Sequence, residues 1–132
     1  MPALTSMAFP NTLATGRALL ADIAEVRLAP PPNFEGGRLI TISELPGRTN
    51  PDDDTYFALM LTSCWGSTYN DAVELAGEVQ VRILSAGCTE AGGVLIDTTG
   101  LYTGATEGPE LYPDERRIDA IYQLSWRRQF RP

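Results

Sequence analysis

The chain has 132 residues, of which 43% are hydrophobic and 20% charged, and its formal net charge is −7. This length suits one domain with a single core, and the composition is too apolar for a chain that stays unfolded. There is no histidine and no CxxC pair, so a zinc site is disfavoured and acid–base chemistry near neutral pH lacks its usual side chain. No apolar run approaches the roughly 20 residues of a membrane span.

The basic residues are ten arginines and no lysine, and they are unevenly placed. Residues 1–115 hold five arginines against sixteen acids, a balance of −11, whereas residues 116–132 hold five arginines against Asp119 alone, a balance of +4. An acidic body argues against direct nucleic-acid binding, which depends on clustered cations. Two interpretations of the C-terminal arginines remain open: their side chains are solvated, or they pair with acids of a neighbouring copy. The residues are Arg116, Arg117, Arg127, Arg128 and Arg131.

The first third of the chain predicts a helix and then a strand. Asn11 or Thr12 can cap a helix whose apolar face runs to Val26, and the prolines at 30–32 would end it. Residues 38–45, RLITISEL, alternate between apolar and polar side chains, which is typical of a strand.

Residues 46–55, PGRTNPDDDT, combine chain breakers with three consecutive acids. Pro46 and Gly47 would close the preceding strand, and a hairpin to the next strand follows if the loop is short in space. The acids lack the alternate spacing and distal glutamate of an EF-hand, so they indicate a solvated loop rather than a metal site. They are Asp52, Asp53 and Asp54.

The middle of the chain predicts a strand that turns directly into a helix. Residues 56–64 are mainly apolar and suit a strand buried on at least one face. Trp65-Gly66 ends this run, and the hydroxyl and carboxyl groups at 67–71 can cap a helix. Apolar residues then recur at spacings of three and four, which indicates one buried helical stripe: Ala72, Leu75, Ala76, Val79, Ile83 and Leu84.

The last third predicts two more strands. A short strand at 94–99 follows a glycine stop, and residues 100–117 form a long irregular stretch that contains Leu101, Tyr102 and Tyr112. Long loops in compact domains are commonly functional or ordered by a partner. The final segment alternates best of all, with Asp119, Gln123, Ser125 and Arg127 on one side and apolar residues on the other, namely Ile118, Ala120, Tyr122, Leu124 and Trp126.

These elements predict an α+β fold in which two helices pack on one mainly antiparallel sheet of about four strands, in the order α-β-β-α-β-β. We expect residues 1–132 to form a single domain, with flexible residues 1–10 and a long loop at 100–117. The strand-to-helix turn allows two functional hypotheses: Cys64 acts as a nucleophile, and Trp65 forms the wall of a ligand pocket. A small buried thiol and a core anchor are the interpretations we favour, so we expect no catalytic, cofactor or metal site.

The order and spacing of several segments resemble the tail terminator (tail completion) proteins of long-tailed bacteriophages, particularly those of actinobacterial hosts. The likeness covers most of the chain. It rests on the N-terminal helix, APPPNF, the RLITI strand, the aspartate-bearing loop before a strand that ends in CWG, the helix DAVELAGEVQVRIL, and a last strand ending in YQLSWRRQF.

The resemblance implies a small α+β subunit that assembles into a six-membered ring, caps the tail tube, ends its polymerisation and joins it to the head connector. It implies assembly in the bacterial host cytoplasm, a place at the tail-neck junction of the virion, and DNA passing through the lumen without specific binding. The partners would be other copies of the chain, the tube protein and a neck protein, with no membrane. The expected contact residues are the five C-terminal arginines, Asp52, Asp53, Asp54, Leu101, Tyr102 and Tyr112.

Three other functions fit the same sequence. One is an inhibitor or immunity-type protein with an acidic surface, which would stay monomeric and bind a basic partner tightly. Another neck or head-completion protein would share the size, the acidic balance and the oligomerisation. A small cytosolic ligand-binding domain or enzyme would use Cys64, Trp65 and the 100–117 stretch as a pocket, and it would be a monomer that binds a small molecule.

Overall fold

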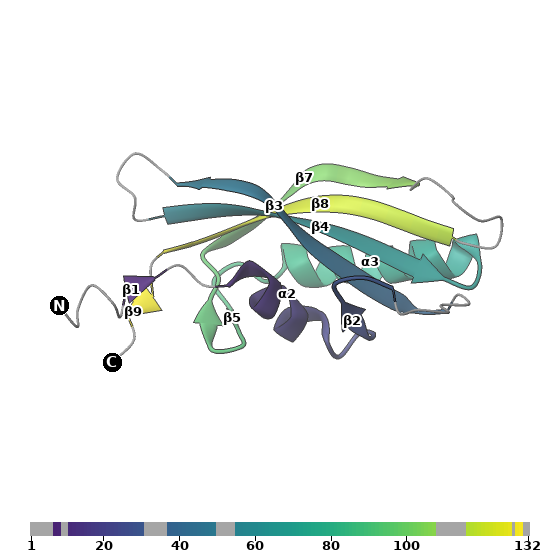
Figure 1. Ribbon diagram of the computed structural model, residues 1–132, viewed down its shortest axis with the longest axis horizontal. Helices are drawn as coiled ribbons and strands as arrows, with labels where there is room; N and C mark the ends of the chain where they lie inside the picture. Colours follow the sequence, from purple (N-terminus) through teal and green to yellow (C-terminus); the bar gives the residue numbers. More distant parts are fainter. Residues whose placement is uncertain are drawn as a thin grey trace.

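The computed structural model describes residues 7–8, 11–30, 37–49, 55–107, 116–127 and 129–130. Five strands form the main sheet in the order β2-β3-β4-β8-β7, and both helices lie on the same side of it (Figure 1). The predicted α+β class is therefore confirmed. The helices are α2 (Thr12–Leu20) and α3 (Tyr69–Leu84), and the sheet strands are β2 (Val26–Arg27), β3 (Leu39–Thr49), β4 (Thr55–Gly66), β7 (Thr98–Glu107) and β8 (Arg116–Arg127).

The first helix is shorter than predicted, and a strand follows it. Asn11 is the N-cap, with its side chain accepting from the Ala14 backbone N–H at 3.0 Å, and the helix ends at Leu20. Val26 belongs to β2, which runs parallel to β3 and pairs with Ile40. The prediction that the helical face reaches Val26 is wrong, because this segment pairs with β3 in the sheet instead of continuing the helix.

Strand β3 does not stop at Pro46-Gly47 as predicted. The two residues form a bulge between Leu45 and Arg48, after which pairing with β4 resumes up to Thr49. Within the described residues, β2 pairs with β3 only at Ile40 and Thr41, so the segment of β3 around Pro46 lies at a sheet edge, where a proline removes no hydrogen bond of the sheet. A Cβ on Gly47 would lie 2.5 Å from the Phe57 carbonyl oxygen, which explains the glycine at the bulge.

The turn from β4 into α3 follows the prediction closely. Thr68 is the N-cap and accepts from the Asp71 backbone N–H at 3.2 Å. Gly66 lies against the first turn of the helix, where a Cβ would meet the Ala72 backbone nitrogen at 2.5 Å. The buried stripe of α3 contains Ala72, Leu75, Val79 and Ile83, whereas Leu84, which we placed on it, is 41% exposed.

The strand expected at 94–99 is divided between two strands, and residues 100–107 of the irregular stretch expected at 100–117 belong to the second of them, whereas residues 108–115 lie outside the described residues. Strands β5 (Glu90–Ala91) and β6 (Val94–Leu95) are joined by Gly92-Gly93, both with positive φ, as a tight hairpin turn requires. Strand β7 then covers Thr98–Glu107 and pairs antiparallel with β8. Pairing with β8 satisfies the backbone of a glycine- and threonine-rich segment whose composition suggested a loop.

The main core lies between the sheet and the two helices. The alternation predicted for the last strand is confirmed, because Ile118, Ala120, Tyr122, Leu124 and Trp126 are all buried. Most of these residues join side chains of α2, α3, β3 and β4 in one hydrophobic cluster. Apart from the main sheet, β1 (Met7–Ala8) pairs antiparallel with β9 (Gln129–Phe130), so the first and last strands of the chain lie side by side (Figure 1). In the ranges that the structure describes, no helix is long and apolar enough to cross a membrane.

Candidate assembly surface

The sheet has a second face that points away from both helices, which we call the outer face. Along β4, Ala58, Met60 and Cys64 belong to the core cluster, so side chains at even positions point to the core and those at odd positions point to the outer face. Phe57 and Leu59 are such residues, and neither is fully buried. The apolar run of β4 therefore supplies side chains to both faces of the sheet.

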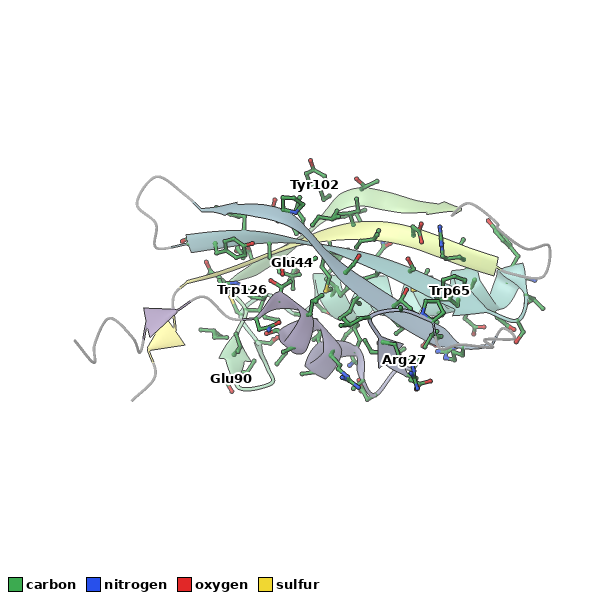
Figure 2. All side chains as sticks on the ribbon, in the orientation of Figure 1. Arg27, Glu44, Trp65, Glu90, Tyr102 and Trp126 are labelled. Atoms are coloured by element: carbon green, nitrogen blue, oxygen red, sulfur yellow. The ribbon has the colours of Figure 1, made fainter. Side chains whose placement is uncertain are left out.

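A hollow of about 300 Å³ opens on this outer face. It extends from the bulge of β3 across β4 and β8 to β7, and it is lined by Pro46, Gly47, Phe57, Leu59, Tyr102 and Gln123. Tyr102 is 62% exposed and lies on the side of the sheet away from the helices (Figure 2). An exposed aromatic beside an apolar hollow is typical of a protein contact site.

A second group of outer-face residues surrounds Trp65 at the other end of β4. The indole N–H of Trp65 donates to Thr41 Oγ1 at 3.1 Å, and the Arg117 guanidinium lies over the indole ring, 5.3 Å from its centroid. Arg117 Nε also lies 3.1 Å from Asp119 Oδ1. Trp65 is buried, as expected of a packing anchor, but it packs on the outer face, outside the main core cluster.

The structure brings together only part of the predicted contact set. Leu101 pairs with the core residue Tyr122 and is 45% exposed at the sheet edge, and Tyr102 follows at a register shift and reaches the hollow. Arg117 is engaged with Trp65 and Asp119 as described above. Arg116 and Arg127 occupy the two ends of β8. Outside the described residues lie Arg128, Arg131, Asp52, Asp53, Asp54 and Tyr112.

The geometry around Cys64 offers no nucleophile. Cys64 is 1% exposed in the core, and burial raises the pKa of its thiol to about 12, which keeps it protonated. Its neighbour Trp65 points to the opposite face of the sheet, so the two side chains cannot line one pocket, and the hypothesis that they do is wrong. Cys88 is exposed and, like Cys64, a free thiol. No cluster of His, Cys, Asp or Glu suited to a metal ion occurs in the part of the chain that the structure describes.

Sequence reasoning identified only Tyr102 among the six residues of the hollow. Pro46 and Gly47 were assigned only to the end of a strand. Phe57 and Leu59 were assigned only to a buried run, and Gln123 only to the polar side of the last strand. The available signal was the run itself, because apolar residues at both odd and even positions of a strand imply two apolar faces. Their meeting with Tyr102 depends on the order of strands in the sheet, which periodicity does not specify.

Comparison of the sequence with protein-family models and with curated proteins gives no match. Among solved structures, the chain is similar to one described as the virion of a native gene transfer agent particle, with a TM-score of 0.61 at 17% sequence identity. The alignment covers 88% of this chain and 85% of that chain. At this identity the likeness establishes a shared fold over nearly the whole of both chains.

Proposed function

We propose that this protein is a structural component of a phage-like virion and that it acts as the tail terminator. In this role, copies of the chain form a ring, most simply a hexamer, that caps the tail tube, stops its polymerisation and carries the joint to the head connector. The observation that carries the proposal is the fold shared with a chain of a gene transfer agent virion over 88% of this sequence.

The surface of the subunit is consistent with a structural role. The described part of the chain holds no metal-ligand cluster, and the thiol of Cys64 is buried and protonated. In contrast, the outer face offers an apolar hollow beside the exposed Tyr102. A contact surface of this kind is what a ring subunit requires.

The net charge of −7 also suits the proposed role. A lumen lined by an acidic protein repels phosphate, so DNA can pass without being held. The basic C-terminal segment would then contribute to contacts between subunits instead of to the lumen. Charge reversal at Arg127 and Arg128 tests this part of the proposal, because it should weaken ring formation in a salt-dependent manner.

Electron microscopy of tail tubes with and without the purified protein tests the main proposal. We expect one ring of fixed subunit number at the end of each capped tube, and tubes that stop growing when the protein is added. Bare tube ends at saturating protein would refute the terminator role. Binding to an isolated head connector without binding to tubes would identify a neck or head-completion protein instead.

A further inference from the structure

The solvent-facing side of α3 carries an apolar ridge that the fold leaves uncovered. Tyr69, Val73, Gly77 and Val81 follow one another at steps of four residues, which places them in one row along the helix. Val73 is 44% exposed and Val81 70% exposed. This ridge is distinct from the buried stripe of the same helix, so it has no role in the core of the subunit. Exposed apolar side chains aligned in this way mark a contact surface.

The ridge and the hollow of the outer face lie on opposite sides of the sheet. Helix α3 packs on the core side, and Tyr102 projects on the other side (Figure 2). The ridge is convex, whereas the hollow is concave and lined mainly by apolar residues of β3 and β4, together with Tyr102 of β7 and Gln123 of β8. A Cβ on Gly77 would meet no atom within 4 Å, so Gly77 forms a notch in the ridge that a protruding aromatic ring such as Tyr102 can approach closely.

The exposed side of α3 and the strand ends next to the hollow carry residues of opposite formal charge. Asp71 and Glu74 lie on the exposed part of α3, whereas Glu78 is already neutralised by an ion pair with Arg38. On the sheet, the backbone register pairs Arg48 with Phe57 and Arg127 with Thr55, at the end of β4 where the hollow opens. Complementary charges of this kind fix the register of a contact and exclude partners of the wrong sign.

We propose that α3 of one copy docks in the outer-face hollow of the next copy, with Gly77 against Tyr102 and the acids of α3 near the arginine-bearing strand ends. This inference rests on the proposed function, because it specifies the contact that closes the ring. Two different surfaces on opposite sides of one subunit make a heterologous contact, which generates a ring when the rotation closes, and not a two-fold dimer.

Engineered disulfides test this arrangement directly. In a Cys88→Ser background, the double variant Gly77→Cys/Tyr102→Cys should form, on tube-bound protein, a ladder of cross-linked species longer than dimers. Each single variant alone should stay uncross-linked, and an equal mixture of the two should give dimers and nothing longer. Efficient dimers from Gly77→Cys alone would overturn the proposal, because they would show that α3 packs on α3. Absence of a ladder from the double variant would overturn it as well.

A charge placed on the ridge provides a second test. Val81→Asp should abolish the ladder, because docking would bury an unpaired carboxylate, whereas Leu28→Asp, at a residue that is 66% exposed and outside both surfaces, should leave it intact. Equal ladders in the two variants would overturn the proposal. The outcome is separable from the proposed function: rings on tube ends without a ladder would refute only this contact, whereas tubes without rings would refute the terminator role.

Discussion

Replacing Gly66 with alanine should destabilise the protein through a backbone clash at the strand-to-helix turn. The new Cβ would lie 2.5 Å from the Ala72 backbone nitrogen and 2.9 Å from the Asp71 carbonyl carbon. Both atoms belong to the first turn of α3, so they cannot rotate away as a flexible side chain could. Gly66 is absent from the glycines with positive φ in the described ranges, and the cost is therefore steric. Overpacking against rigid atoms costs about 2–3 kcal/mol of unfolding free energy.

Gly77→Ala is the matched control, because it makes the same chemical change at a glycine of α3 with open space around it. Nothing lies within 4 Å of the Cβ position, so helix propensity alone should stabilise this variant by about 1 kcal/mol. The two variants should therefore differ by about 3–4 kcal/mol in unfolding free energy. Urea unfolding followed by far-UV circular dichroism at one protein concentration measures the difference without relying on Trp65, which adjoins the substitution.

The steric reasoning predicts a particular order of stabilities: Gly66→Ala, then wild type, then Gly77→Ala. If Gly66→Ala were as stable as wild type while Gly77→Ala gained stability, the close approach of β4 to the first turn of α3 would be refuted. If both variants gained about 1 kcal/mol, the turn would tolerate a side chain and would not constrain how strand and helix pack.

Three further predictions concern single side chains. Alkylation of the native protein at about pH 8 should label Cys88 and spare Cys64, whose pKa is raised to about 12 by burial, so mass spectrometry should detect one label until denaturant is added. The hydrogen bond from Arg82 lowers the pKa of Asp22 below its usual 3.8. The folding stability contributed by this ion pair is therefore fully present above that value and is lost as the pH falls through the lowered pKa. Asp22→Asn should therefore flatten the fall in melting temperature below about pH 4, and an unchanged slope would contradict this. Trp126→Phe should stay within about 1 kcal/mol of wild type in chemical unfolding, because the small cavity is offset by removal of a buried indole N–H that has no partner among the described residues.

Elements with a strong local pattern were predicted well. The buried stripe of α3 and its cap at Thr68 follow from helical spacing and from the need of the first backbone N–H groups for an acceptor. The alternation that ends at Trp126 likewise identified the core side of β8. In both elements, buried and exposed positions repeat with the period of the helix or strand, so the local sequence is enough to predict which side chains are buried.

Predictions failed where pairing with a distant strand outweighed local preference. The local pattern predicts a helix at Val26, which instead pairs with Ile40 of β3. It predicts the end of a strand at Pro46-Gly47, which instead form a bulge in a strand that continues. Residues 100–107 were predicted as part of a loop, and pairing with β8 makes them a strand. In each segment, the backbone hydrogen bonds are satisfied by residues that are remote in the sequence, so the local pattern did not contain the answer.

The sequence by itself determined the α+β class, the core side of the last strand, and the lack of histidine and of any CxxC motif, because these follow from composition and short periodicities. It also predicted a contact role for Tyr102, although within a predicted loop, and that role stays a prediction. Only the tertiary structure decided that Tyr102 meets Phe57, Leu59 and Gln123 across three strands, and that this hollow and the ridge of α3 lie on opposite sides of one sheet. The physical reason is that a surface is assembled by strand order and helix packing, and both depend on contacts between distant residues.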